Sequence, residues 1–87
     1  MKDVFTHIGF GNIVNLSHVI SIVSPEAAPI KRLVQNAKDK ETCIDASAGR
    51  KTKAVIVMDN GMVVLSALLP ETIAARIEER DFEKNET

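Results

Sequence analysis

Apolar and β-branched residues dominate the first 23 positions of the chain and are interrupted only by short polar segments. Gly9-Phe10-Gly11-Asn12 and Asn15-Leu16-Ser17 contain the small and turn-forming residues that commonly separate strands. The pattern therefore predicts strands over roughly 4–9, 12–15 and 18–23.

The pattern changes to helical spacing after Ser24-Pro25-Glu26, which interrupts the strand-forming sequence. Pro29 suits the first turn of a helix, where its missing N–H would have no partner, and Ala28 before it is biased away from helical dihedral angles. A helix is therefore expected from about residue 29 to about Lys40, followed by sequence that favours extended backbone. Its apolar stripe consists of Ile30, Leu33, Val34 and Ala37.

A hairpin is predicted in the second half of the chain. Two apolar runs, 54–58 and 62–68, flank Asp59-Asn60-Gly61, and Asn-Gly between such runs is a strong hairpin signal. The runs do not alternate with polar residues, which indicates burial on both faces. Two short helices can cover one face, so a second subunit is expected on the other; the alternative is that loops of the same chain cover it.

A second helix is predicted to begin at Pro70 and to end near Arg80, with a narrow apolar stripe spaced by four residues. The fold class is thus α+β, with a small, mostly antiparallel sheet and two helices. A chain of 87 residues has room for one core, so 1–80 form one domain and the acidic tail 81–87 is expected to be disordered. Small size and 45% hydrophobic residues favour a homo-oligomer.

Charge is unevenly distributed, although the net charge is only −1. The segment 31–53 contains seven Lys or Arg and three Asp or Glu, whereas acids dominate the chain after residue 77. Arg50, Lys51 and Lys53 fall together at the entry to a predicted strand. Such a group can bind the phosphates of duplex DNA, and the alternative interpretation is an ordinary solvated turn.

Several other chemistries are disfavoured. Gly9-Phe10-Gly11 lacks the third glycine of a dinucleotide-binding loop, since Val14 occupies that position, and Gly49-Arg50-Lys51-Thr52 lacks the first glycine of a P-loop. Three phenylalanines and no Trp or Tyr make a base-stacking RNA binder a poor fit. No apolar stretch is long enough for a membrane span and no signal peptide is evident, so a cytoplasmic location is expected.

No metal, cofactor or enzymatic activity is expected. The candidate soft ligands are His7, His18 and Cys43, and no two of them have the spacing of a helical metal motif. Ser17 and His18 are adjacent in an extended segment, so their side chains would point to opposite faces and could not pair as nucleophile and base.

The chain resembles the RemA-like family, the extracellular matrix regulatory proteins of bacteria. The resemblance covers roughly 7–77, and the order and spacing of its segments together are specific. The segments are Ile8-Gly9-Phe10-Gly11-Asn12, Ile20-Ser21-Ile22-Val23-Ser24-Pro25-Glu26, Ala28-Pro29-Ile30-Lys31-Arg32, Ile44-Asp45-Ala46, Gly49-Arg50-Lys51-Thr52-Lys53-Ala54-Val55, Met58-Asp59 and Pro70-Glu71-Thr72.

The resemblance implies a nucleoid-associated DNA-binding activator of biofilm matrix genes that forms a ring-shaped homo-oligomer and has no small-molecule substrate. Lys51 and Lys53 stand where the family pattern has arginines, so charge is kept while bidentate phosphate binding is not. His18 stands where the family usually has Arg, and it should weaken DNA binding or make it pH-sensitive.

The expected DNA-contacting residues are thus Arg50, Lys51, Lys53 and, less directly, His18, Lys31 and Arg32. A function of a different class remains open, namely a structural ring or protein-interaction scaffold in which the same basic residues are merely solvated.

Overall fold

The computed structural model describes residues 4–77 of the chain. The predicted tail 81–87 and the predicted end of the second helix near residue 80 lie outside these residues. The hairpins and both helices that the sequence pattern predicts are present, which confirms the α+β class. The strands form two sheets, however, where a single sheet was expected.

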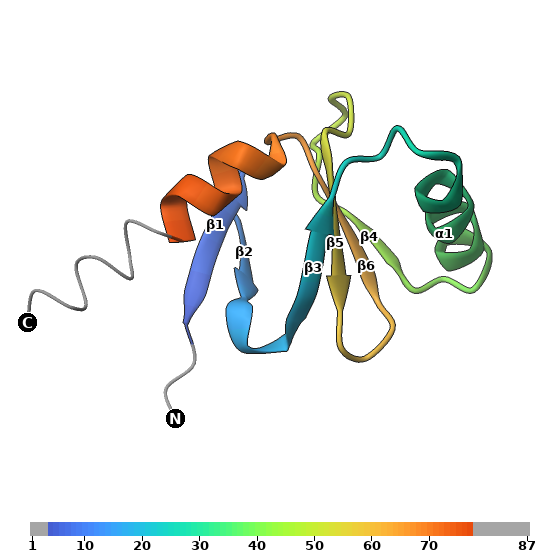
Figure 1. Cartoon of the computed structure of the whole chain (residues 1–87), viewed down its shortest axis with the longest axis horizontal. Coiled ribbons are helices and arrows are strands. Elements are labelled where there is room, and N and C mark those ends of the chain that lie inside the picture. The colour runs from blue at the N-terminus through green and yellow to red at the C-terminus, as the bar shows by residue number, and fades with distance from the viewer. Residues whose placement is uncertain (1–3, 78–87) are drawn as a thin grey trace, which may run out of the picture.

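The smaller sheet is the antiparallel hairpin of β1 and β2, and the larger has the strand order β3-β5-β6-β4. A single 3₁₀ turn, Leu16–His18, joins the two sheets. A helix over 70–77, drawn in orange and without a label in Figure 1, follows the last strand. The other elements are β1 Phe5–Gly9, β2 Asn12–Asn15, β3 Val19–Val23, α1 Ala28–Asp39, β4 Cys43–Asp45, β5 Ala54–Met58 and β6 Val63–Ser66.

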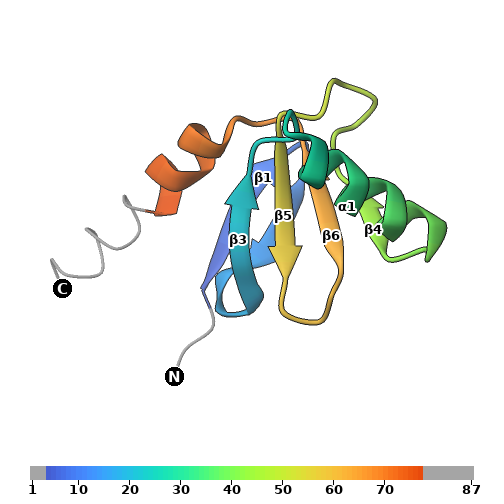
Figure 2. The same ribbon diagram turned by 45° about the vertical axis from the view of Figure 1, so that its right-hand side comes forward.

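The larger sheet is the middle of three layers (Figure 1). On one face Val55, Val63 and Leu65 pack against α1, where Ala37 is buried and Ile30 and Val34 are partly buried. On the other face Ala54, Ile56 and Val64 pack with Ile8 and Val14 of the hairpin and with Ile73 of the helix 70–77. Figure 2 shows β3, β5 and β6 side by side with β1 behind them.

The predicted burial of the hairpin 54–66 on both faces is confirmed, but the inference that a second subunit covers one of them is wrong. Ala54, Val55 and Ile56 are completely buried within a single chain. The reason is that β1 and β2 pair with each other and stack on the larger sheet instead of extending it. The chain therefore supplies both covers itself.

Strand β4 was not predicted, and it pairs in parallel with β6 through Cys43↔Val63, Ile44↔Val64 and Asp45↔Leu65. The return strand is also shorter than predicted, since β6 ends at Ser66. The Ser66 hydroxyl accepts a hydrogen bond from the Leu68 N–H at 3.0 Å and donates one to the Ile8 carbonyl at 2.8 Å. This buried side chain turns the backbone out of the sheet and joins both sheets.

Candidate functional site

The basic residues singled out in the sequence lie on the connection between β4 and β5, residues 46–53, which we call the basic loop. Both of its ends are bonded to β6: the Ala46 N–H donates to the Leu65 carbonyl and the Lys53 N–H to the Ser66 carbonyl, each at 2.8 Å. Between these anchors, Ala48 and Gly49 have left-handed backbone conformations with φ of 57° and 78°. The loop therefore turns sharply, and Ala46 and Ser47 at its start are buried whereas residues 48–51 and Lys53 are exposed.

The start of the loop is stabilised by Asp45. Its carboxylate accepts hydrogen bonds from the backbone N–H of Ser47 at 3.0 Å and from the Ser47 hydroxyl at 2.5 Å. These bonds favour the ionised carboxylate and lower the pKa of Asp45 below its ordinary value, while desolvation opposes them. Asp45 thus holds the turn and is not a candidate acid or base.

Arg50 lies against the tip of the β1–β2 hairpin. Its guanidinium carbon is 4.8 Å from the centroid of the Phe10 ring, a cation–π contact between residues 40 positions apart in sequence. Both side chains are exposed, and half of the Phe10 surface remains accessible to solvent. The guanidinium is held in place without being buried, so its donors can still reach a ligand.

Lys51 and Lys53 line a shallow depression between the basic loop, the β3–α1 connection and the start of the helix 70–77. Glu26 and Glu71 line it as well, so the depression holds charges of both signs. None of Arg50, Lys51 and Lys53 has a carboxylate within ion-pair distance among residues 4–77. The three cations are therefore available to an anionic ligand. Arg50 does not line the depression, so it is also separated from Glu26 and Glu71.

The remaining predicted site residues lie elsewhere in the chain. Lys31 and Arg32 are exposed on α1, on the opposite side of the larger sheet from the β1–β2 hairpin (Figure 1). His18 ends the 3₁₀ turn, and its Nδ1 lies 2.8 Å from Oδ2 of Asp59. Lys53 precedes β5 and Asp59 follows it, so these positions are about 20 Å apart at the rise of an extended strand.

Arg50, Lys51 and Lys53 therefore share one loop, on which Arg50 contacts the hairpin tip and the two lysines line the depression, whereas His18, Lys31 and Arg32 lie elsewhere. Sequence reasoning missed one residue of the site, Phe10, and the partner of His18, Asp59. Phe10 stands out in the sequence only as part of a glycine pair, and its contact with Arg50 has no local signal. Asp59 stands out only as a turn residue and as part of a family segment, whereas it is the partner of His18.

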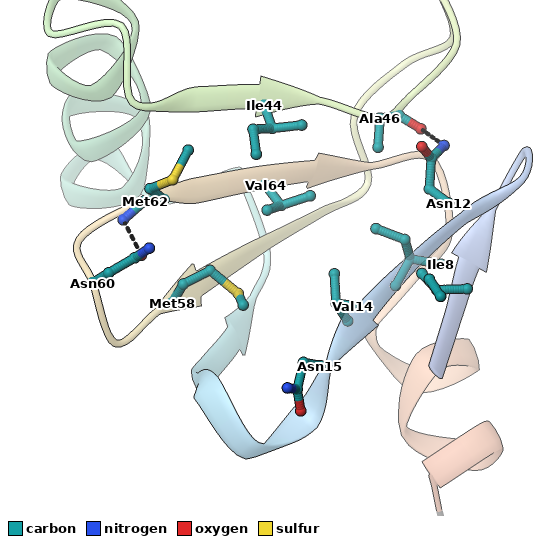
Figure 3. Close-up of a pocket in the computed structure, with 11 residues that line it drawn as sticks. Ile8, Asn12, Val14, Asn15, Ile44, Ala46, Met58, Asn60, Met62 and Val64 are labelled. Atoms are coloured by element: carbon teal, nitrogen blue, oxygen red, sulfur yellow. Dashed lines mark hydrogen bonds between the residues drawn. The ribbon is translucent and has the colours of Figure 1, made fainter. Parts of the chain in front are cut away.

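A second surface feature is an apolar cavity of about 240 Å³ between β2 and the β4–β6 side of the larger sheet (Figure 3). Its lining includes Ile13 and Ile44, which are about half exposed, with Met58 and Met62 near the β5–β6 turn. Asn12 closes one end by donating a hydrogen bond to the Ala46 carbonyl at 3.4 Å. Among the residues that the structure describes, no acid, base, cysteine or histidine lines this cavity, so its chemistry is that of an apolar binding surface.

A metal-binding arrangement is not found in the part of the chain that the structure describes. No three His, Cys, Asp or Glu side chains there are grouped to hold a metal ion. Cys43 is partly buried beside α1, and desolvation raises the pKa of its thiol above the ordinary value. Nor does any described helix have both the length and the apolar character needed to cross a membrane.

Comparison with known proteins gives a consistent result. Residues 5–77 match the model of the RemA-like family, described as extracellular matrix regulatory protein A-like. A protein of Lachnoclostridium phytofermentans is 62% identical over 81 residues, covering 92% of this chain and 89% of its own length. A Dictyoglomus thermophilum protein is 58% identical over 78 residues, covering 90% and 92%. Both are named "Putative regulatory protein".

Proposed function

The chain belongs to the RemA-like family of regulatory proteins, and from this premise we propose that it regulates transcription by binding duplex DNA through its basic loop, without catalysing a reaction. The gene class suggested by the family description is that of the extracellular matrix, and the expected action is activation in the cytoplasm, at the nucleoid. Double-stranded DNA and further copies of the chain are the proposed partners.

The observation that carries this proposal is the exposed set of Arg50, Lys51 and Lys53, none of which forms an ion pair with a carboxylate among the described residues. Duplex DNA presents a dense row of phosphates, and cations that reach them release condensed counterions. Arg50 offers a planar group that can bind a phosphate through two N–H donors, whereas Lys51 and Lys53 offer point charges. Most of the affinity should therefore depend on Arg50.

A single copy presents a small area to DNA, and its other candidate cations face different directions. We therefore propose that the functional unit is a homo-oligomer, arranged as a ring, in which each subunit adds one basic loop to a shared DNA-binding surface. His18 lies beside Asp59, at the end of β5 that is far from the basic loop. It could approach DNA only if the assembly places this end of β5 next to the basic loop of a neighbouring subunit. Assembly does not rest on the hairpin 54–66, which the chain itself covers.

Fluorescence anisotropy with a labelled duplex, titrated at several salt concentrations, tests the proposal. Removing one cation that neutralises a phosphate should flatten the slope of log affinity against log salt by about 0.9. Arg50→Ala should weaken binding about tenfold or more, since it removes a hydrogen bond to a charged group. Lys51→Ala and Lys53→Ala should have milder effects.

The proposed homo-oligomer is tested separately: light scattering should give a mass several times the 9.5 kDa of one chain.

Lys40 supplies the matched control, because it is an exposed base just after α1 and outside the basic loop. Lys40→Ala should leave both the affinity and the salt slope nearly unchanged. Wild-type protein that shows no salt-dependent affinity for duplex DNA, or Arg50→Ala protein that binds with wild-type affinity and slope, would exclude the basic loop as a DNA-binding site.

The apolar cavity between β2 and β4 favours one alternative, a scaffold that binds another protein without touching DNA. Exposed Ile13 and Ile44 at its rim are typical of an interaction surface. The two functions differ in their salt dependence: protein binding at an apolar surface should persist at high salt, whereas DNA binding should be abolished.

A further inference from the structure

We propose that Phe10 is a positioning residue for Arg50, so that the tip of the β1–β2 hairpin acts as a platform for the DNA-binding guanidinium. The inference rests on the proposed function. It assigns a role to the Gly9-Phe10-Gly11-Asn12 segment, which does not have the glycine pattern of a dinucleotide-binding loop. The ring would hold one face of the guanidinium while the N–H groups at its edge remain free for phosphate.

The exposure of Phe10 argues against a role in the core. Its ring is 50% exposed, although nearby Ile8 is completely enclosed at 1% exposure. Phe10 also has a φ of 55°, a left-handed conformation that is unfavourable for a bulky side chain. A residue chosen only for turn formation at this position would be Gly or Asn. The ring is therefore kept at a strained, solvent-facing position where it stacks on Arg50.

The hairpin tip is built as a rigid platform. The side-chain amide of Asn12 donates to the carbonyls of Gly9 at 3.0 Å and Phe10 at 3.2 Å, which ties the turn to itself. Gly9 has a φ of 99°, and a Cβ atom there would lie 3.3 Å from Cγ of Leu68. A side chain at Gly9 would thus be strained and crowded, so the tip sits close against the segment that follows β6.

The platform and the basic loop are also connected directly. The same Asn12 amide, whose two N–H donors are shared among three carbonyls, also approaches the carbonyl of Ala46, the first residue of the basic loop, at 3.4 Å, the longest of the three contacts. Arg50, which follows the turn at Ala48 and Gly49, makes the second contact: its guanidinium carbon lies 4.8 Å from the centroid of the Phe10 ring. The loop is fixed to the hairpin at two points, so Arg50 is held at a defined place relative to both sheets.

Stacking leaves the function of the guanidinium intact. Arginine donors lie in the plane of the group, and a ring that covers one face does not block that edge. A free arginine side chain must give up rotational freedom when it binds phosphate, whereas one already held against a ring gives up less. At the strength of an exposed cation–π contact, the platform should increase affinity about two- to fivefold per Arg50 engaged.

A double-mutant cycle measures this coupling. Phe10→Leu should weaken duplex binding about two- to fivefold in the wild-type background and have no effect in the Arg50→Ala background. Phe10→Tyr, which retains the ring, should restore wild-type affinity. Leu is not β-branched and meets the same left-handed backbone as Phe, so thermal unfolding and oligomer mass should stay unchanged. Phe5→Leu is the matched control, since Phe5 is similarly exposed at 45% on β1.

A second measurement needs no DNA. The side-chain protons of Arg50 should resonate upfield in NMR spectra because of the Phe10 ring current, and this shift should disappear in Phe10→Leu and remain in Phe10→Tyr. An Arg50 signal at its usual position in the wild type would overturn the inference.

The outcomes of the cycle separate this inference from the proposed function. If the wild-type protein fails to bind duplex DNA, both the proposed function and the positioning role of Phe10 are wrong. Wild-type binding that depends on Arg50 but is unchanged in Phe10→Leu removes the positioning role alone. An equal weakening from Phe10→Leu in both backgrounds would mean that the ring touches DNA itself, which also overturns the positioning role.

Discussion

Replacing Ile73 with Ala should destabilise the fold more than replacing any other residue of the helix 70–77 with Ala. Ile73 is completely buried and packs with Ile8, Val14 and Ile56 on the face of the larger sheet opposite α1. It is the one fully buried residue among 70–77. The covering of this face by the helix therefore depends largely on one side chain.

The magnitude follows from burial. Removing a buried Ile side chain costs about 2–5 kcal/mol, depending on how far the site can collapse. The helix lies at the outside of its layer and can relax partly, so we expect about 3 kcal/mol. For a domain of this size that corresponds to a melting temperature lower by roughly 12–24 °C. Ala is a better helix former than Ile, so the destabilisation would report packing rather than helix propensity.

Urea unfolding followed by circular dichroism is the assay, with protein concentration fixed because assembly would couple to stability. Leu69→Ala is the control: Leu69 is 47% exposed just before the same helix and should cost about 1 kcal/mol or less. A destabilisation below about 1 kcal/mol for Ile73→Ala would refute the reasoning and show that the sheet face is covered mainly by the hairpin.

Three further predictions concern charge. Glu71→Gln should tighten duplex binding about two- to threefold in low salt, with the difference vanishing at high salt, because Glu71 shares a depression with Lys51 and Lys53; an anisotropy titration checks this. The lowered pKa of Asp45 means that its stabilising effect is present above the ordinary pKa of 3.8 and disappears as pH falls below it. The difference in melting temperature between wild type and Asp45→Ala should therefore shrink from about pH 6 towards about pH 3. Deleting 81–87, which carries three acids and one base, should modestly tighten DNA binding in the same titration, most clearly in low salt.

Much of the fold could be predicted from local patterns. The Asn60-Gly61 turn between two apolar runs located the β5–β6 hairpin, and Pro29 located the start of α1 to within one residue. These signals work because turn and helix-start preferences act between residues that are close in sequence. They also identified the exposed basic segment, since charge density is a property of the sequence itself.

The rest depends on contacts between distant residues. The sequence after the first helix favours extended backbone, but the parallel partner of β4, β6, lies about twenty positions later, so nothing local predicts that the two strands pair. Continuous apolar strands indicated burial but could not say which segment provides the cover. Likewise, no spacing rule connects Phe10 with Arg50 or His18 with Asp59.

The attachment of the basic loop to β6 has an evolutionary consequence. Its two ends are fixed by hydrogen bonds to consecutive residues, Leu65 and Ser66, so the loop leaves and re-enters the sheet across the end of one strand. Substitutions or small insertions between Ala48 and Lys53, beyond the buried Ala46 and Ser47, would change what the loop presents without changing strand register or core packing. Relatives could therefore diverge in the ligands they bind while keeping the same scaffold, since the exposed part of the loop can vary independently of the part that folds.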